Sequence, residues 1–520
     1  MALADVLFGL RVVTSRGDLD VPIAKVTDDS RQVERGDLFV AVTGRTVDGH
    51  RFVAAAQEAG AAAVMVEREV DFDGTVVRVT SSARGLGIAA ANRAGNPGRA
   101  MRMASITGTN GKTTTTYILE SILAVAGEAP GVVGTVSYRF GATERKAPFT
   151  TPTAPALQSL LGEMATAGCS HVVMEVSSHA LELRRVAGLS FEVAAFTNFT
   201  QDHLDLHGSM EAYLAAKQRL FSHHLDADGV AVLWADDPTA ERLVEGFAGR
   251  VVRVSGRDPG ADVYVQRQGS SLEGLRARVT LGDEVLSLRS PLVGDHNLNN
   301  IAVAVAMASE LGLGGETIAR GVALLKCVPG RLERVASDAD VPVLVDYAHT
   351  PDALAHTIAT LRPLCAGRLI CVFGCGGDRD ALKRPLMGRT VADGADLAVV
   401  TSDNPRTEDP LAIISQILDG VAPSGRERIP PEGLAAARQG YTVVPDRRAA
   451  IRAAVDAADP ADVVLVAGKG HEDYQILGTR RIHFDDREES REALEARATI
   501  GSKHRGSRGA SLSRNEEGER

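Results

Sequence analysis

Between residues 99 and 330, short apolar runs rich in β-branched side chains alternate with stretches of helical periodicity. The apolar runs lie at 103–106, 172–176 and 193–197, and the helical stretches lie at 117–125 and 210–221. Alternation of this kind predicts a mainly parallel sheet with helices on both faces.

The first 98 residues carry a shorter version of the same pattern. Apolar runs that predict strands lie at 38–42, 63–66 and 75–79, and an alanine-rich stretch at 51–59 predicts a helix. The segment 93–99 contains Gly95, Pro97 and Gly98, which favour irregular backbone, so we expect a linker there.

From about residue 331 to residue 495, apolar runs end abruptly in polar or glycine-rich turns. These turns lie at 346–349, 374–379, 403–406 and 468–472. Because ligands bind outside the carboxyl ends of strands in an open parallel sheet, the turns predict one site built from several loops. The alternative is that they are ordinary turns, but Arg379, Arg406, His471 and Glu472 are not residues that turns prefer.

A chain of 520 residues is too long for a single hydrophobic core. We expect an α/β protein of three domains, at 1–98, 99–330 and 331–495, with Pro329-Gly330 marking the second boundary. From about Gly501 the chain is rich in serine, glycine and charge, so we expect residues 496–520 to form a disordered tail.

The composition excludes several classes of protein. Hydrophobic residues make up 44% and charged residues 24%, as in globular proteins, and the net charge of −10 argues against non-specific binding of nucleic acid. We find neither an apolar run long enough to span a membrane nor a signal peptide. The 5 cysteines show no metal-ligand spacing, and Cys371 and Cys375 lie in an apolar stretch where packing explains them. We therefore expect a cytoplasmic enzyme without nucleic-acid or membrane partners.

The stretch 108–114 predicts a pocket for nucleotide phosphates. It comprises Gly108, Thr109, Asn110, Gly111, Lys112, Thr113 and Thr114. A glycine-rich turn between a strand and a helix points backbone N–H groups at an anion, on the positive end of the helix dipole. Lys112 can reach the β- and γ-phosphates, and the hydroxyl of Thr113 can hold Mg²⁺. The motif is shortened, since Ile106 stands where the first glycine is usual.

Further polar residues follow the neighbouring predicted strands. Glu175 lies where a carboxylate can hold Mg²⁺ beside a nucleotide, although a structural ion pair is the alternative. The run at 197–208 is dense in Asn, Asp and His, which suits a second metal or a phosphate. By periodicity alone, Lys217 is a solvated lysine on a helix.

Taken together, six motifs resemble those of the Mur ligases, which make peptidoglycan precursors by ATP-dependent amide formation. They lie, in the order of the family, at 108–114, 175–179, 197–208, 295–300, 329–333 and 346–349. The resemblance extends from about residue 26 to residue 487. It implies a small α/β N-terminal UDP-binding domain, a central P-loop ATPase domain and a C-terminal Rossmann-like domain.

The resemblance also implies roles for individual residues. ATP would bind to the phosphate loop, with Asn297 at adenine, Arg331 at a phosphate and Asp346 at the ribose. Mg²⁺ would be held by Thr113, Glu175, His203 and a carbamylated Lys217. Carbamylation turns the lysine into a carboxylate-like ligand, so the resemblance replaces the interpretation of Lys217 as a solvated side chain. Lys112, Lys217 and His203 would then be the catalytic residues.

The N-terminal segments 28–31 and 36–41 resemble the uridine-diphosphate domain of the MurE and MurF types. The resemblance implies that UDP-N-acetylmuramoyl-L-alanyl-D-glutamate contacts Ser30, Thr150, Thr151, Ser177 and Arg185. The stretch Arg45-Thr46-Val47 falls where the family contacts the uridine end.

The turn Asp403-Asn404-Pro405-Arg406 matches the loop of family members that add diaminopimelate, the MurE type. Diaminopimelate has a second carboxylate that lysine lacks, and a guanidinium can hold a carboxylate through two parallel hydrogen bonds. The resemblance implies a site formed by Arg379, Asp403, Asn404, Pro405, Arg406, Gly468 and Glu472. Glu472 would receive the ammonium group of the ligand.

The resemblance implies a monomeric, ADP-forming ligase that adds meso-diaminopimelate through an acyl phosphate, with ATP and Mg²⁺ as cofactors. The alternatives are a relative that adds L-lysine or LL-diaminopimelate, and a related folate or peptide ligase. A P-loop regulator without ligase activity is an alternative of another class. It would account for the phosphate loop but not for the polar strand ends of the third domain.

Overall fold

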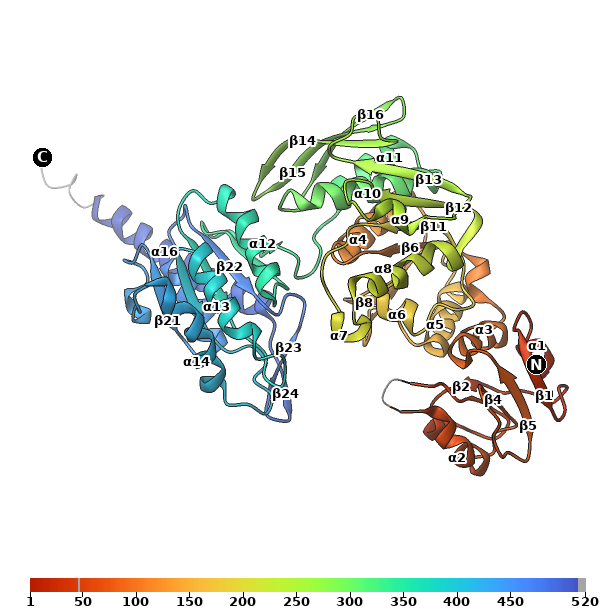
Figure 1. The fold of residues 1–520 in the computed structure, drawn as a ribbon. Helices are drawn as coiled ribbons and strands as arrows, with labels where there is room; N and C mark the ends of the chain where they lie inside the picture. Colours follow the sequence, from red (N-terminus) through yellow and green to blue (C-terminus); the bar gives the residue numbers. More distant parts are fainter. Residues whose placement is uncertain (45–46, 513–520) are drawn as a thin grey trace, which may run out of the picture. The chain divides into compact units, whose positions relative to one another are not determined.

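The computed structural model describes residues 1–44 and 47–512, with side chains described to residue 499. Arg45 and Thr46, two of the residues predicted at the uridine end, therefore lie outside the described residues. The chain divides into two compact units (Figure 1). The first comprises Met1–Gln268, Arg276–Ser290 and His296–Leu325, and the second comprises Gly269–Leu275, Pro291–Asp295 and Lys326–Arg520.

The N-terminal part of the first unit is a sheet with the order β1-β5-β4-β3-β2. Its strands are β1 (Val12–Arg16), β2 (Val26–Thr27), β3 (Leu38–Val40), β4 (Ala63–Val66) and β5 (Thr75–Val79), and its helices are α1 (Leu3–Val6), α2 (Val53–Glu58) and α3 (Ser82–Arg93). The three strands and the helix predicted here are confirmed. Helix α3 was not predicted, because Gly85 and Gly87 weaken its helical pattern. A Cβ atom at Gly87 would lie 2.5 Å from the carbonyl oxygen of Ala187, so close packing requires this glycine.

The second sheet has eleven strands, in the order β16-β15-β14-β13-β12-β11-β6-β10-β7-β8-β9. These are β6 (Arg102–Thr107), β7 (Pro130–Val133), β8 (Ser137–Phe140), β9 (Thr143–Lys146), β10 (His171–Glu175), β11 (Phe191–Phe196), β12 (Leu225–Trp234), β13 (Arg250–Ser255), β14 (Val263–Ser271), β15 (Gly274–Leu281) and β16 (Glu284–Ser290). The neighbouring strands β14, β13, β12, β11, β6, β10 and β7 run parallel to one another, as predicted. The antiparallel extension β7-β8-β9 was not predicted.

The helices beside this sheet position its site. They are α4 (Lys112–Val125), α5 (Ala154–Thr166), α6 (Ser178–Glu182), α7 (Leu204–His207), α8 (Met210–Arg219), the π-helix η4 (Leu220–His224), α9 (Ala240–Leu243), α10 (His296–Glu310) and α11 (Gly315–Leu324). Helix α4 packs against α10 and α11, while α5 and α8 share a buried cluster with the central strands. Strands β10 and β11 flank β6, so their carboxyl ends lie beside the phosphate loop.

The second unit holds a sheet with the order β17-β18-β22-β19-β20-β21. Its elements are β17 (Glu333–Arg334), β18 (Val343–Asp346), α12 (Pro351–Leu361), β19 (Leu369–Phe373), α13 (Lys383–Gly394), β20 (Leu397–Val400), α14 (Pro410–Val421), β21 (Gly440–Val443), α15 (Arg447–Ala457), β22 (Val463–Ala467) and α16 (Asp486–Leu512). Strands β18, β22, β19, β20 and β21 are parallel. Helices α12, α13 and α14 contribute to one buried cluster, and α15 and α16 contribute to another. The open parallel sheet expected for this part of the chain is thus confirmed.

This unit contains a hairpin that was not predicted and a helix where a disordered tail was expected. A hairpin of β23 (Tyr474–Leu477) and β24 (Arg480–His483) follows β22. Helix α16 continues to Leu512, although residues 496–520 were expected to be a disordered tail. The helix begins in a segment rich in Glu, Ala and Arg, which are strong helix formers, and an existing helix gains one hydrogen bond for each residue it adds.

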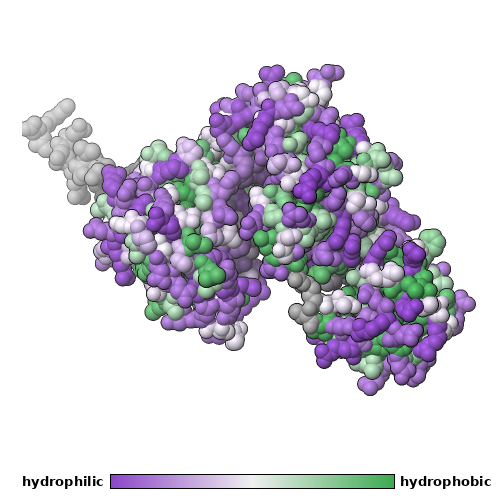
Figure 2. Space-filling model, viewed as in Figure 1, coloured by the Kyte–Doolittle hydropathy of each residue, from purple (hydrophilic) through white to green (hydrophobic). Residues whose placement is uncertain are grey.

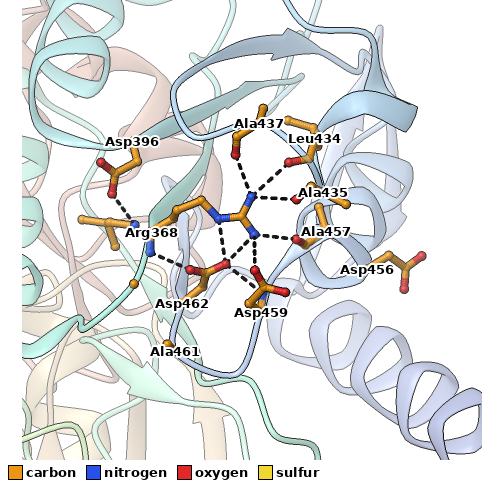
Figure 3. A network of polar contacts seen from close by, with 12 residues as sticks. Arg368, Asp396, Leu434, Ala435, Ala437, Asp456, Ala457, Asp459, Ala461 and Asp462 are labelled. Carbon is orange, nitrogen blue, oxygen red and sulfur yellow. Dashed lines mark hydrogen bonds and ion pairs between the residues drawn. The ribbon is translucent and has the colours of Figure 1, made fainter.

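A buried guanidinium directly before β19 connects this sheet to the surrounding loops. Arg368 donates hydrogen bonds to the carbonyl oxygens of Ala437 and Ala457 at 2.8 Å and to the carboxylate of Asp462 at 2.9 and 2.6 Å (Figure 3). Both side chains of the ion pair are at most 5% exposed. Burial raises the pKa of Asp462, but hydrogen bonds from Arg368 and from backbone amides outweigh burial and leave the pKa below its ordinary value.

We predict that Asp462→Asn lowers the free energy of unfolding by about 3–5 kcal/mol, because it leaves the buried charge of Arg368 without its partner. Thermal unfolding of the full chain measures the loss. Asp393→Asn is the matched control, since its ion pair with Arg389 is half-exposed and contributes at most about 0.5 kcal/mol. Equal unfolding temperatures for the two variants would contradict the structural role of the pair.

The surface shows no large apolar region in the face drawn in Figure 2, where hydrophilic residues predominate. Among the described residues, no helix is long and apolar enough to cross a membrane. All cysteines are free thiols and all but Cys327 are buried, which confirms that Cys371 and Cys375 serve packing.

Candidate active site

The predicted phosphate loop connects β6 to α4, as expected. Its Lys112 Nζ donates hydrogen bonds to the carbonyl oxygens of Gly108 and Thr109 at 2.8 and 2.9 Å. A Cβ atom at Gly108 would lie 2.0 Å from Thr197 Oγ1, and one at Gly111 would lie 2.2 Å from Asn300 Oδ1. Both glycines also have positive φ angles, so the loop has a backbone conformation and a closeness of packing that only glycine permits.

The segment after β11 fixes this loop. Asn110 N–H donates to Asn198 Oδ1 at 2.9 Å, and Asn198 Nδ2 donates to the carbonyl oxygen of Asn110 at 3.0 Å. The hydroxyl of Thr109 lies 3.1 Å from Tyr213 Oη on α8. These bonds hold the loop in an open turn at the N-terminus of α4, a conformation that suits phosphate binding.

Glu175, at the end of β10, lies at the centre of a buried hydrogen-bond network. Its Oε2 accepts hydrogen bonds from the hydroxyls of Thr113 and Thr135 at 2.9 and 2.8 Å, and its Oε1 accepts from Thr135 N–H at 2.8 Å. The carboxylate and the Thr113 hydroxyl are oxygen donors of the kind that Mg²⁺ prefers. The network therefore places two of the predicted metal ligands side by side.

Three of the residues predicted to bind the dipeptide are linked through Thr151 to the backbone of Glu175. Thr151 Oγ1 donates to the carbonyl oxygen of Glu175 at 2.8 Å, and Arg185 Nη1 donates to the carbonyl oxygen of Thr151 at 2.9 Å. Ser177 caps α6 by accepting from Ala180 N–H at 3.2 Å, and its own N–H donates to Thr151 Oγ1. The structure thus brings Thr151, Ser177 and Arg185 together.

Of the two remaining residues predicted to bind the dipeptide, Thr150 joins the same region. Thr150 Oγ1 lies 3.1 Å from Thr135 Oγ1, which also contacts Glu175. Ser30 begins a short 3-10 helix of the N-terminal sheet, and Asp28, two residues earlier, interacts electrostatically with Arg185. All these residues belong to the first unit.

Lys217 is buried, so the interpretation of a solvated helix lysine is wrong. The side chain is 1% exposed, and its Nζ lies 4.6 Å from the ring centroid of Tyr213. Burial, with the charge of Lys112 nearby, lowers the pKa of Lys217 well below its ordinary value. Periodicity misled because the face of α8 that carries this residue packs toward the phosphate loop instead of solvent.

His203 shares this environment. It lies in the left-handed region with φ of 53°, at the start of α7. Burial lowers its pKa, and the positive charges of Lys112 and Lys217 lower it further against the opposing effect of Asp202. The described residues contain no group of three His, Cys, Asp or Glu side chains arranged to hold a metal ion. The magnesium site therefore stays a prediction whose fit rests on Thr113 and Glu175.

The predicted ATP residues beyond the loop are divided between the units. Asn297, on α10, accepts a hydrogen bond at 2.9 Å from Asn300, the residue packed against Gly111. Arg331 and Asp346 belong to the second unit, where Asp346 accepts from the N–H groups of Leu332 and Ala348 at 2.7 and 2.8 Å. Burial raises the pKa of Asp346, and the charge of Arg331 partly offsets the rise.

The four predicted loops of the second unit line a single cavity of about 290 Å³. Its lining includes Arg379, Asp403, Asn404, Arg406, Gly468 and Glu472, all predicted at this site. It also includes Tyr347, His349, Gly374, Cys375 and Gly376, which lie in the predicted loops without an assigned ligand contact, and Lys383, which was not predicted. Pro405 does not line the cavity, and its carbonyl oxygen instead packs against Gly377. Strands β18, β22, β19 and β20 are neighbours, which explains why their ends meet.

Arg406 is held at the edge of this cavity by its backbone. Its φ is 51°, its N–H donates to the carbonyl oxygen of Ile476 at 3.0 Å, and its carbonyl oxygen accepts from Gly478 N–H at 2.7 Å. The hairpin β23–β24 therefore positions this residue. Its Nη1 donates to the carbonyl oxygen of Gly377 at 2.7 Å, which leaves other guanidinium N–H groups for a ligand in the cavity.

A buried ammonium contacts two of the lining residues. Lys469 is 0% exposed, and its Nζ lies 3.4 Å from Asn404 Oδ1 and 3.3 Å from Glu472 Oε2. Asn404 Nδ2 donates to Glu472 Oε2 at 3.0 Å, and Asn404 Oδ1 accepts from Ile476 N–H at 2.9 Å. These contacts fix the amide and the carboxylate against each other.

Comparisons with known proteins agree with this arrangement. Three family models match: "Mur ligase family, catalytic domain" over residues 22–106, "Mur ligase middle domain" over 106–308 and "Mur ligase, glutamate ligase domain" over 330–470. A UDP-N-acetylmuramoyl-L-alanyl-D-glutamate--2,6-diaminopimelate ligase of Gloeobacter violaceus is 47% identical over 93% of this chain and 96% of its own length. The chain belongs to the Mur ligase family.

Other relatives of this Mur ligase extend the comparison. A protein of Geobacter metallireducens with the same name is 45% identical over 94% of this chain and 97% of its own length. A solved structure of a ligase of that name covers 96% of this chain and 99% of its own, with 32% identity and a TM-score of 0.70. A MurF ligase of Thermotoga maritima in complex with ADP is 21% identical, covers 92% of this chain and 99% of its own, and shares the fold with a TM-score of 0.58.

Sequence reasoning missed Lys469 of this Mur ligase, since a lysine between two glycines has the pattern of an exposed turn. We predict that Lys469→Met raises KM for the amino acid about tenfold, because removing the buried donor leaves Asn404 and Glu472 less well oriented. The KM for ATP should stay unchanged. Steady-state kinetics with each substrate varied in turn measure the effect.

The control for this prediction is Lys326→Met, which removes an exposed lysine of the same unit. A loss of kcat in Lys469→Met without a change in KM for the amino acid would contradict the positioning role. So would an equal rise in KM for ATP, which would indicate a general loss of structure.

Proposed function

We propose that this Mur ligase joins meso-2,6-diaminopimelate to UDP-N-acetylmuramoyl-L-alanyl-D-glutamate in peptidoglycan synthesis, with cleavage of ATP to ADP and phosphate. The observation that carries the proposal is the cavity of the second unit, in which two arginines, an asparagine and a glutamate converge from parallel strand ends. The names of the relatives at 45% and 47% identity support the same substrates.

The first unit would activate the acceptor carboxylate. The γ-phosphoryl group passes from ATP to the carboxylate of the dipeptide, which gives an acyl phosphate and ADP. Lys112 and the N–H groups of the phosphate loop stabilise the negative charge that spreads over the transferring group. Mg²⁺ would neutralise phosphate charge beside Thr113 and Glu175.

An unprotonated Lys217 would react with carbon dioxide. Its lone pair forms a bond to the carbon atom, a proton leaves the nitrogen, and the product is a carbamate with one negative charge. The buried environment that lowers the pKa of Lys217 favours the neutral amine that this reaction needs. The carbamate and His203 would then complete the metal ligands that the family resemblance implies.

The second unit would supply the amine. A diaminopimelate amino group attacks the acyl carbon, a tetrahedral intermediate forms, and phosphate leaves as the amide is made. Arg406 and Arg379 would hold the carboxylate of the distal centre, Asn404 would orient it, and Glu472 would accept its ammonium group. Asp403 and Gly468 shape the cavity, since a Cβ atom at Gly468 would lie 2.8 Å from Asp403 Oδ2.

The remaining contacts are proposals of the same kind. Ser30, Thr150, Thr151, Ser177 and Arg185 would hold the UDP-muramoyl dipeptide beside Glu175. Thr151 donates to the carbonyl oxygen of Glu175 and accepts from Arg185 through its own carbonyl oxygen, while Thr150 contacts Thr135, which donates to the Glu175 carboxylate. The roles of Asn297 at adenine, Arg331 at a phosphate and Asp346 at the ribose rest on the family resemblance, as do the monomeric state and the cytoplasmic location.

The release of ADP tests the proposed reaction. We expect ADP to form only when ATP, Mg²⁺, the UDP-muramoyl dipeptide and diaminopimelate are all present, and a ligation product to form in equal amount. ATP hydrolysis that proceeds equally well without the dipeptide and the amino acid would instead support a P-loop regulator.

A further inference from the structure

A larger cavity, of about 940 Å³, lies at the opposite end of the central sheet from the phosphate loop. It is lined by the first residues of β6, β11 and β12, by the start of α3, and by the segment that follows α6. Its position places it between the N-terminal sheet and the central sheet, within the first unit. None of the residues assigned to ATP, Mg²⁺ or the dipeptide lines this cavity.

Arg84 and Arg184, from different parts of the unit, line the cavity without a partner among the described residues, as does Arg99 before β6. Arg84 comes from the first turn of α3, and Arg184 comes from the segment after α6. Among the described residues, neither guanidinium has an ion pair or a hydrogen bond, whereas Arg102, in the same lining, is paired with Glu192. Within the described residues, the positive charges of these two guanidinium groups are therefore not neutralised by an ion pair.

Burial and the positive charge of the arginines lower the pKa values of neighbouring side chains. Burial lowers the pKa of Arg184, and the positive charges of Arg219 and Arg84 lower it further, against the effect of Glu182. Burial lowers the pKa of His223, and Arg184, Arg84 and Arg219 lower it further. Like charges that lie this close repel each other unless an anion lies between them.

The acidic residues of the lining do not remove this imbalance. Glu192, which lines the cavity, is engaged by Arg102, and Glu182, which is not part of the lining, is engaged by Arg219. Asp226 and Asp228, at the start of β12, contribute to the pKa shift of neither Arg184 nor His223. Asp226 and Asp228 line the same cavity, but the charges that act on Arg184 and His223 are mainly those of other arginines.

The two arginines are held in place by tightly packed backbone. Arg184 has φ of 56°, in the left-handed region. Just beyond it, a Cβ atom at Gly188 would lie 2.9 Å from the carbonyl oxygen of Gly87 on α3. Thr80 and Ser81 also line the cavity, so the positive end of the α3 dipole lies beside Arg84. The segment that carries Arg184 is therefore packed closely against α3, the helix that carries Arg84.

We propose that this cavity binds a phosphate group between Arg84 and Arg184, at the junction of the N-terminal and central sheets. A doubly charged oxyanion can accept hydrogen bonds from both guanidinium groups, for which arginine is well suited. The ligand would be inorganic phosphate or a phosphorylated small molecule, and it would stabilise the junction that the two arginines span.

Thermal unfolding in the presence of inorganic phosphate tests this proposal. The full chain is titrated with phosphate at constant ionic strength, with Mg²⁺ and ADP in excess so that the nucleotide site is filled. We compare the wild type with Arg84→Gln and with Arg11→Gln, which removes an exposed arginine of the same N-terminal part. We expect a saturable rise in unfolding temperature for the wild type and for Arg11→Gln, and at least about tenfold weaker binding for Arg84→Gln.

A second readout separates an anion site from a structural arginine. Without phosphate, Arg84→Gln should unfold at the same temperature as the wild type or a higher one, because the repulsion from Arg184 is gone. Arg84→Lys, which keeps the charge, should retain most of the phosphate response. An equal phosphate response in wild type and Arg84→Gln, or no saturable response in the wild type, would overturn the proposal.

Discussion

Replacing Arg406 with alanine is expected to lower kcat/KM for diaminopimelate by about 10²- to 10³-fold. Removing one partner of a desolvated, hydrogen-bonded charge pair costs about 2–5 kcal/mol, and each 1.4 kcal/mol is about a factor of ten. The backbone of Arg406 is fixed by the hairpin β23–β24, so the loss should come from the guanidinium and not from a shifted loop. Steady-state ADP release at varied diaminopimelate measures it.

Two comparisons make this prediction specific. Arg438→Ala removes an exposed arginine of the same unit and should leave the kinetics unchanged. Arg406→Lys keeps the charge but not the planar fork, and we expect it to recover only part of the activity. Wild-type kinetics in Arg406→Ala would remove the assignment of this arginine to the second carboxylate.

Lys217→Arg is expected to lower kcat by at least about 10²-fold, which is the usual cost of losing one group that stabilises transition-state charge. Arginine stays protonated in proteins, so it cannot form the carbamate. Lys217→Met should be equally inactive. It should unfold no more easily than the wild type, because it removes a buried amine whose charged form is unfavourable there.

Carbon dioxide provides an independent test of the same residue. Thorough removal of dissolved carbon dioxide should lower the activity of the wild type, and bicarbonate should restore it. The residual activity of Lys217→Met should respond to neither treatment. Full activity in Lys217→Arg, or a wild-type activity that does not change when carbon dioxide is removed, would contradict the proposed carbamate.

The sequence predicted site residues best where those residues come at or directly after the end of a strand. The phosphate loop, Glu175 and the loops that carry Arg379 and Arg406 could be located because apolar runs identify strands, and the ends of parallel strands meet at one edge. The C-terminal cavity is lined by these predicted loops, although they are far apart in the chain.

Residues whose roles depend on tertiary contacts could not be predicted in this way. Periodicity assigned Lys217 to solvent because a helix pattern does not reveal which neighbour covers a face. Lys469 is buried by β23, a short strand with no strong alternation, and by the glycine-rich turn around it. The arginines of the larger cavity, Arg84 and Arg184, come from segments that only the folded chain brings together.

The most direct test of the proposed function offers diaminopimelate and L-lysine to the enzyme in competition. Isotopically labelled meso-diaminopimelate, unlabelled LL-diaminopimelate and L-lysine are supplied at equal concentration with ATP, Mg²⁺ and the UDP-muramoyl dipeptide, and the product masses are measured. We predict that the labelled meso product predominates, with lysine disfavoured at least about 10²-fold because it would leave Arg406 unpaired. A lysine product in comparable or greater amount would contradict the account.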